Sequence, residues 1–206
     1  MHAMESTMEQ PCRRLAVIGT AGRDAKAPMS ADLWRAMVAD VRTRVRADDV
    51  LVSGGAAWAD HLAVHAFLQG WVARLELYLP APMVCNDYNA NAPFFAGPQR
   101  SSGNAANYYH LRFRAVAGVA SLSELGGLVR EMPSGFAWDA QPVEPGYAAM
   151  YRRNALVASR CTDLLAYTFG PGDQPADGGT AHTWRLASHA RRVHVPLGLL
   201  CSALAL

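Results

Sequence analysis

Three short glycine-bearing stretches hold the residues of this chain that are best suited to chemistry. They are Gly19-Thr20-Ala21-Gly22-Arg23, Ser53-Gly54-Gly55 and Asp177-Gly178-Gly179-Thr180. A glycine backbone at the start of a helix lets an anion approach the free N–H groups, and the helix dipole favours negative charge there. The three stretches therefore predict a cradle for a phosphate or carboxylate group.

The first stretch supplies a hydroxyl from Thr20 and a cation from Arg23. It matches neither GxGxxG nor GxxxxGK[ST], so a standard dinucleotide fold and a P-loop NTPase are disfavoured. A plain turn and a ligand loop explain Gly19 and Gly22 equally well.

The second stretch is more specific, because small residues follow Gly55 and let a helix approach the strand closely. Asp60 falls in the first turn of that helix, where its carboxylate either interacts with the helix dipole or binds a ribose hydroxyl. If the helix start receives a phosphate, a methyl group added at Gly55 or at Gly179 should weaken binding about tenfold, or ~1.4 kcal/mol.

The third stretch repeats this arrangement, with hydroxyls from Thr180 and Thr183 near a predicted helix start. The preceding helix carries Arg152, Arg153 and Asn154, which can supply charge-assisted hydrogen bonds. Adjacent residues on a helix point in different directions, so we expect one of the two arginines to face the site.

Alternating apolar runs and amphipathic segments indicate how these stretches are positioned. Strands are expected at residues 14–18, 50–52, 73–79, 163–169 and 192–197. Helices are expected at residues 31–45 after a Ser30 cap, 58–67, 147–161 and 181–190. The order predicts an α/β fold, a Rossmann-like parallel sheet with helices on both faces, whose βα loops meet at one edge. Ligands bind at that edge in such sheets.

Residues 83–146 differ in composition, being rich in Asn, Pro, Gly, Ser and aromatic residues. They contain two segments that allow helices, 105–117 and 121–129. A loop this long is usually functional, so we interpret it as an insertion or lid after the third strand of a single domain that spans residues 1–206.

Composition narrows the class of protein. The 206 residues are 51% hydrophobic with a formal charge of +2, and the arginines are scattered, which makes nucleic acid an unlikely partner. The four cysteines form no CxxC pair, and His61 and His65 lack the glutamate of HExxH, so neither a metal nor another cofactor is expected. No run of about 20 apolar residues occurs, which predicts a soluble, cytoplasmic protein without a membrane partner.

The glycine stretches carry a resemblance to a known superfamily. SGGAAWADHLA resembles the SGGA-x-G-x-D-x-x-A element of the SLOG superfamily, which includes the DNA-processing protein DprA and the LOG phosphoribohydrolases. RRNALVASRCTDLLAY with the later GGTAHTWRLA is similar to the arginine helix, apolar strand and PGGxGTxxE turn of LOG proteins. The resemblance implies a Rossmann-like fold that binds nucleotides, with ADP-ribose-like ligands as a reasonable class, and it allows a homodimer.

The departures from that pattern limit what the resemblance implies about catalysis. Thr183 stands where LOG enzymes have a glutamate, and a threonine cannot act as a carboxylate base. We therefore expect a binding protein first. The alternative is a LOG-like N-glycosidic hydrolase or transferase that uses a carboxylate from elsewhere. The candidates for that carboxylate are Glu124, Glu131, Asp139 and Glu144.

Overall fold

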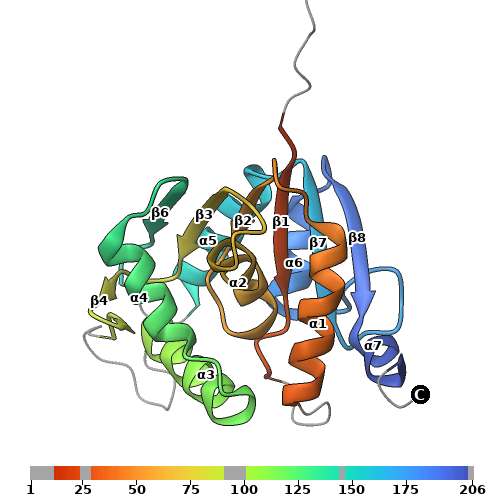
Figure 1. Cartoon of the computed structure of the whole chain (residues 1–206), viewed down its shortest axis with the longest axis horizontal. Helices are drawn as coiled ribbons and strands as arrows, with labels where there is room; N and C mark the ends of the chain where they lie inside the picture. The colour runs from red at the N-terminus through yellow and green to blue at the C-terminus, as the bar shows by residue number, and fades with distance from the viewer. Residues whose placement is uncertain (1–11, 24–28, 91–100, 144–146, 204–206) are drawn as a thin grey trace, which may run out of the picture.

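Six parallel strands form the central sheet of the computed structural model, which describes residues 12–23, 29–90, 101–143 and 147–203 (Figure 1). Their order across the sheet is β6-β3-β2-β1-β7-β8. The strands are β1 (Arg14–Gly19), β2 (Val50–Ser53), β3 (Arg74–Leu79), β6 (Phe136–Ala140), β7 (Asp163–Thr168) and β8 (Arg191–Pro196). This confirms the predicted α/β fold class.

Helices cover both faces of the sheet. One face carries α1 (Ala31–Arg44), α2 (His61–Leu68), α3 (Ser102–Ala117), α4 (Ser121–Glu131) and α7 (Leu197–Ala203). The other carries α5 (Ala148–Ser159) and α6 (Gly178–Leu186), which lie behind the sheet in Figure 1. None of the helices in these described ranges is long and apolar enough to cross a membrane.

Alternating side chains of the central strands build the two hydrophobic cores. In β1, Leu15 and Val17 join the core under α1 to α4, whereas Ala16 and Ile18 join the core under α5 and α6. A strand that is buried on both faces reads as an unbroken apolar run, which is why the sequence identified β1 and β7. The first glycine stretch begins at the last residue of β1, and the loop after β7 leads to the third.

The start of α1 follows a predicted cap. Ser30 has an extended backbone, and its hydroxyl accepts a hydrogen bond from the Leu33 N–H at 3.1 Å. The cap satisfies one of the free amides at the helix start and sets the boundary between the first loop and the helix.

The described part of residues 83–146 forms more regular structure than the sequence predicted. It contains the short antiparallel pair β4 (Met83–Val84) and β5 (Asp87–Tyr88), helices α3 and α4, and strand β6. Strand β6 pairs with β3 at the edge of the main sheet, which therefore has one strand more than the five predicted. Only Phe136 of its residues is buried, and the strand lies in the segment that we interpreted as an insertion or lid. The single domain and the insertion or lid stay predictions.

The strands that follow β1 in the chain are added first on one side of it and then on the other. The strands β1, β2, β3 and β6 follow one another to one side, and β7 then pairs with the other side of β1. Such a switch point leaves a crevice at the carboxyl ends of the central strands. The loops after β1 and β7 lie on either side of it.

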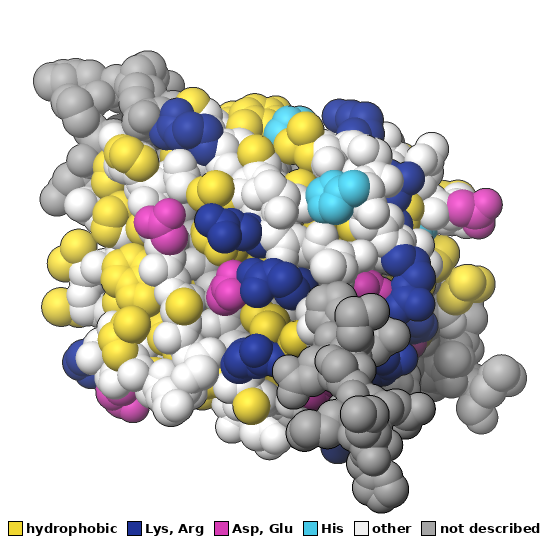
Figure 2. Space-filling view, turned by 90° about the horizontal axis from the view of Figure 1, so that it is seen from above, with side chains coloured by type: hydrophobic (Ala, Val, Ile, Leu, Met, Phe, Trp, Pro, Cys, Tyr) yellow, Lys and Arg dark blue, Asp and Glu magenta, His cyan; other side chains and the backbone are white. Residues whose placement is uncertain are grey.

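Charged side chains of both signs are interleaved at the opposite end of the strands, which Figure 2 shows from above. Arg13 pairs with Asp49 and Arg14 pairs with Glu76, each at 2.5 Å. Arg191 pairs with Asp163 at the start of β7. These pairs place charges of both signs on this face.

His110 attaches α3 to the second glycine stretch. Its Nδ1 lies 2.8 Å from the Ser121 hydroxyl, and its Nε2 lies 3.0 Å from the Gly55 carbonyl oxygen. The ring is buried, and burial together with the nearby His61 lowers the pKa of His110 from 6.5 to about 3. The folded protein therefore keeps this imidazole neutral.

Acid should destabilise the fold through His110. Below about pH 6.5 the unfolded chain binds a proton at this residue and the folded chain does not, so stability is complete above that pH and falls toward pH 3. The slope from this group is at most ~1.4 kcal/mol per pH unit. Urea unfolding between about pH 7 and pH 4 should show a shallower slope for His110→Gln than for the parent. His189→Gln, at an exposed histidine, serves as the control, and equal slopes for all three proteins would contradict the assignment.

Candidate functional site

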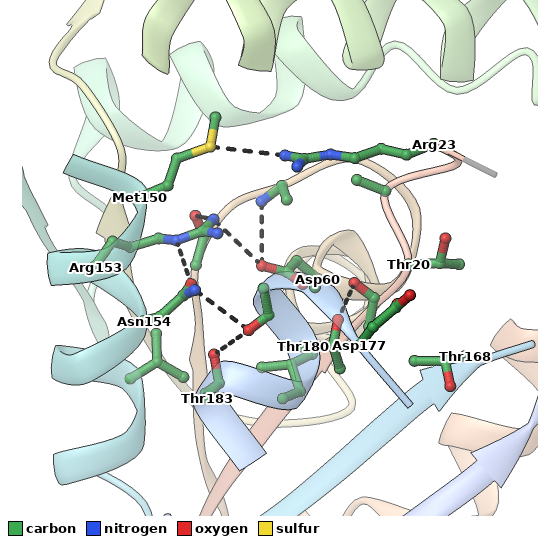
Figure 3. Close-up of a pocket in the computed structure, with 18 of the residues that line it drawn as sticks. Thr20, Arg23, Asp60, Met150, Arg153, Asn154, Thr168, Asp177, Thr180 and Thr183 are labelled. Atoms are coloured by element: carbon green, nitrogen blue, oxygen red, sulfur yellow. Dashed lines mark hydrogen bonds and ion pairs between the residues drawn. The ribbon is translucent and has the colours of Figure 1, made fainter. Parts of the chain in front are cut away.

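A cavity of about 440 Å³ lies at the carboxyl ends of β1, β2 and β7 (Figure 3). Its walls come from the loops after these strands, from helix α5 as far as Val157 and from the first turns of α6. The volume falls within the range of small-ligand pockets, about 300–1,000 Å³. The cavity occupies the crevice that the switch point creates, as the sequence predicted for the glycine stretches.

Most of the predicted ligand-binding residues line this cavity. They are Gly19, Thr20, Arg23, Gly54, Asp60, Arg153, Asn154, Gly178, Gly179, Thr180 and Thr183. Four predicted residues are not among its lining residues: Gly22, Ser53, Gly55 and Arg152. The three stretches therefore converge, but not every residue in them faces the cavity.

A buried ion pair joins two walls of the cavity. The Nη1 of Arg153 lies 3.6 Å from Asp60 Oδ2 and donates a hydrogen bond to the Gly54 carbonyl oxygen at 2.7 Å. Its Nε donates to Asn154 Oδ1 at 3.2 Å. Asp60 and Arg153 are 5% and 9% exposed, so water screens neither charge well. The pair connects α5 with the loop after β2. Of the two adjacent arginines, Arg153 lines the cavity and Arg152 is not among its lining residues.

The absence of a side chain at Gly54 makes this pair possible. A Cβ atom there would lie 2.6 Å from Arg153 Nη1 and 2.8 Å from its Cδ and Cζ. The guanidinium thus passes directly over the glycine backbone. Glycine is therefore required at position 54 by the packing of the Arg153 side chain.

Asp60 also accepts backbone hydrogen bonds. The Ala56 N–H donates to its Oδ2 at 3.4 Å, and burial raises the pKa of the Asp60 carboxyl while Arg153 and the amides of Ala56, Gly19 and Gly54 lower it. Burial lowers the pKa of Arg153, and Asp60 opposes that effect. Each residue therefore stabilises the charged form of its partner against the effect of burial. The carboxylate organises the loops after β1 and β2.

Removal of one charge of this pair should lower the free energy of unfolding much more than removal of both. Arg153→Met leaves Asp60 as an uncompensated buried charge, and a loss of about 3–5 kcal/mol in the free energy of unfolding is expected. Asp60→Asn should also destabilise the protein. The double variant should lose clearly less than the sum of the single losses, because neither charge is then left alone. Urea unfolding of the four proteins measures this coupling, and additive losses would rule out the pair as a structural element.

The start of α6 forms another wall. Its N-cap, Asp177, makes no side-chain hydrogen bond to the first turn. The Thr180 hydroxyl donates to the Gly19 carbonyl oxygen at 2.9 Å, which joins the loops after β1 and β7. Asn154 Nδ2 donates to the Gly179 carbonyl oxygen at 3.3 Å, which joins α5 to α6. The helix start is thus held at the cavity by its neighbours, and its own cap leaves the first amides free of a side-chain acceptor.

Thr183 does not present its hydroxyl to a ligand. The hydroxyl donates to the Gly179 carbonyl oxygen, one turn earlier in α6, at 3.0 Å, and the residue is 3% exposed. Its contribution to the cavity wall is therefore mainly steric.

Arg23 is the exposed cation of the cavity wall. Its guanidinium carbon lies 5.0 Å from the ring centre of Tyr109 and 5.8 Å from that of Tyr147. Its Nη2 lies 3.6 Å from the Met150 sulfur, a weak acceptor, and Figure 3 shows the side chain reaching toward Met150. No acidic partner for Arg23 occurs within the described ranges, whereas Arg153 already has Asp60. Arg23 is therefore the arginine better placed to receive an anionic ligand.

Three of the residues outside the cavity wall serve the fold. The Ser53 hydroxyl lies 3.1 Å from the Val17 carbonyl oxygen and 2.9 Å from that of Asp60. The Gly55 carbonyl oxygen accepts hydrogen bonds from Tyr88 at 2.6 Å and from His110. Arg152 donates to Gln141 Oε1 at 3.1 Å, away from the cavity.

Gly22 accommodates an unusual tryptophan. Trp58, in the short 3₁₀ helix Trp58–Asp60, has a φ of +63°, is 2% exposed and packs on Phe113 with 4.3 Å between ring centres. A bulky residue rarely adopts this left-handed conformation. A Cβ at Gly22 would lie 2.8 Å from the indole Nε1 of Trp58. The superfamily element has glycine where this chain has Trp58.

Gly55 requires a change to the prediction made from the sequence. It has a φ of +65°, and a Cβ there would lie 2.5 Å from Leu79 Cδ2 and 2.9 Å from the Tyr88 hydroxyl, in the core. Gly55→Ala should therefore lower the free energy of unfolding by more than ~1 kcal/mol, rather than block a ligand. Gly179→Ala is the matched variant, because its Cβ would meet only Asn154 Nδ2 at 3.4 Å. Thermal melting of both variants tests the contrast, and a Gly55→Ala protein as stable as Gly179→Ala would contradict it.

Of the four carboxylates suggested for catalysis, the three within the described residues do not line the cavity. Glu124 Oε2 lies 2.5 Å from His61 Nε2, between α4 and α2, and this hydrogen bond lowers the pKa of Glu124. Glu131 is exposed beside Arg130, and Asp139 is exposed on β6. Glu144 lies outside the described residues. Asp60 and Asp177 are the acidic residues among those that line the cavity.

Sequence reasoning missed several residues of the wall. They are Ile18, Ala56, Tyr147, Met150, Tyr151, Val157, Thr168, Phe169, Gly170 and Ala176. The tyrosines are one helical turn apart at the start of α5, immediately before the arginine pair, so their spacing was the available signal. Thr168 and Phe169 end a strand at the predicted ligand edge, which also marked them.

Comparison with known proteins identifies a relative of this chain. No protein-family model matches the chain. The chain is 31% identical over 195 residues to "Uncharacterized protein R261" of Acanthamoeba polyphaga mimivirus, a match that covers 90% of this chain and 97% of the relative.

Two solved structures are similar to this one. The DNA processing protein A (DprA) of Streptococcus pneumoniae has a TM-score of 0.50 and 15% identity, over 94% of this chain and 56% of that chain. The chain thus spans just over half of that DprA. A Helicobacter pylori DprA, described for its single-stranded DNA binding mode, has a TM-score of 0.45 and 13% identity, over 94% of this chain and 80% of that chain. The Streptococcus structure confirms the DprA-like, Rossmann-type fold.

Proposed function

The chain belongs to the same protein family as the mimivirus protein, and we propose that it binds a nucleotide or nucleotide-sugar phosphate of the ADP-ribose-like class. The observation that carries this proposal is the cavity at the switch point, where the start of α6 has no side-chain cap. Free amides at a helix start favour a phosphate. In a Rossmann-type sheet this edge is where ligands bind.

The cavity wall carries polar and aromatic groups together. The polar groups are the start of α6, Thr20 and Arg23. The aromatic side chains are Tyr147, Tyr151 and Phe169, and the two tyrosines are 42% and 53% exposed. An exposed aromatic face can stack on a base, an interaction of about 1–3 kcal/mol. A ligand with a phosphate and a base, joined by a sugar, suits this combination of groups.

One observation supports the alternative of an N-glycosidic hydrolase or transferase. Asp177 is exposed at the cavity and is a carboxylate at the start of α6, so it can lie near the ribose of a bound nucleotide. Cleavage of the N-glycosidic bond needs an anion near the oxocarbenium-like state. Chromatography after incubation with nucleotides should then detect free base. Its absence with folded protein would exclude this alternative.

Binding should depend on Arg23. Calorimetry with AMP, ADP-ribose and cyclic ADP-ribose should detect at least one ligand, and Arg23→Ala should weaken it about tenfold, or ~1.4 kcal/mol, because a charge-assisted hydrogen bond is lost. Arg130→Ala removes the same charge from the exposed surface of α4 and should bind as the parent does. If the parent binds none of the ligands at about millimolar concentration, the proposed ligand class is wrong.

Other expectations from the sequence stay proposals. They are a cytoplasmic location, a homodimer and the lack of a nucleic-acid partner. A gel shift at low salt tests the last of these, because non-specific binding to phosphates is strongest there.

A further inference from the structure

His194 connects strand β8 to the loop after β7. Its Nδ1 lies 2.6 Å from the Gly172 carbonyl oxygen, and its Nε2 lies 2.7 Å from the Thr168 hydroxyl oxygen. A carbonyl oxygen can only accept a hydrogen bond, so Nδ1 carries the hydrogen. In the neutral imidazole Nε2 is then an acceptor, and Thr168 donates its hydroxyl hydrogen to it. The hydroxyl therefore faces a base whose orientation the Gly172 carbonyl group fixes.

Thr168 is the last residue of β7 and belongs to the cavity wall (Figure 3). Gly170, which also lines the cavity, leaves space beside the Thr168 hydroxyl. A Cβ atom at position 170 would lie 3.7 Å from Thr168 Oγ1 and 3.7 Å from the backbone nitrogen of Ala176, at ordinary contact distance. Within the described ranges, no acceptor takes a hydrogen bond from the Ala176 N–H. A hydroxyl and an available amide thus border the same space.

These groups match the parts that nucleophilic catalysis requires. A hydroxyl is a weak nucleophile until an adjacent base takes its proton, and the base acts best when a third group holds it in place. Thr168, His194 and the Gly172 carbonyl group supply these three parts. A backbone N–H next to the nucleophile can stabilise the oxyanion that forms when a carbonyl carbon is attacked. The electrophile that suits the arrangement is therefore an acyl group.

We propose that Thr168 and His194 are a catalytic pair that hydrolyses a small carboxylic ester in the cavity. Thr168 Oγ1 attacks the carbonyl carbon, and the hydroxyl proton passes to His194 Nε2. The bond to the alcohol oxygen then breaks, the alcohol leaves with that proton, and the acyl group stays on Oγ1. A water molecule repeats the sequence, which releases the carboxylic acid and restores the hydroxyl. The inference goes beyond the proposed function, because it needs the cavity but no nucleotide.

Hydrolysis of para-nitrophenyl acetate, followed by absorbance, tests the pair. The parent should hydrolyse this ester above the uncatalysed rate. Thr168→Val removes the nucleophile, and His194→Gln keeps hydrogen bonding but cannot take the proton, so each should lower kcat/KM about 100-fold. Thr168→Ser keeps the hydroxyl and should retain activity within about tenfold of the parent. Circular dichroism confirms that each variant is folded.

Two matched variants make the same changes away from the cavity. Thr43→Val is exposed on α1 and His189→Gln is exposed after α6, and both should hydrolyse the ester as the parent does. Mass spectrometry of peptides from acid-quenched parent protein should find the acetyl group on Thr168, a readout that needs no variant. A parent that hydrolyses the ester no faster than Thr168→Val, or that carries no acetyl group on Thr168, would overturn the inference.

The catalytic pair and the proposed function fail in different ways. If hydrolysis depends on Thr168 but no nucleotide binds, the proposed function is wrong and the catalytic pair stands. If a nucleotide binds but the parent hydrolyses the ester no faster than Thr168→Val, the nucleotide site stands and the catalytic pair is wrong. If both hold, a bound nucleotide should inhibit hydrolysis, because the two ligands share one cavity.

Discussion

The buried pair of Asp60 and Arg153 is the interaction on which the geometry of the site depends. It joins helix α5, from one face of the sheet, to the loop after β2 and to the end of the short helix Trp58–Asp60. Because each charge is nearly inaccessible to water, neither is tolerated without the other. Gly54 has no side chain, so the guanidinium can reach this position.

The glycines of the cavity region were expected to serve a ligand, and the structure divides them. Gly54, Gly55 and Gly22 each leave room for a side chain of the protein itself: Arg153, Leu79 and Trp58. Around Gly178, by contrast, nothing lies within 4 Å of an added Cβ, and its φ is +70°. A glycine pair before a helix can thus indicate close packing in one loop and an open approach in another, with the same residue types.

The sequence predicted the fold better than the site because the two depend on different information. Apolar runs such as Leu15 to Ile18 and the Ser30 cap are local signals, and strand β1 and helix α1 formed where they indicated. Strand β6 was missed because its five residues lie in a segment whose Asn, Pro, Gly and Ser content indicated a loop. Asp60 and Arg153 are far apart in the chain. No local pattern therefore distinguishes a paired Asp60 from an acid that interacts only with a helix dipole. The direction of the missing Cβ at Gly55 is likewise set by tertiary packing.

The contact between Gly22 and the indole of Trp58 has a consequence for evolution in this family. The two positions share one volume, so a relative that gains a side chain at position 22 has to lose the indole at position 58, where a glycine would also remove the strain of a positive φ. Substitutions at the two sites should therefore appear together along a lineage, with each order of change passing through a less fit intermediate. Pairwise covariation between these positions is expected even though neither residue lines the cavity.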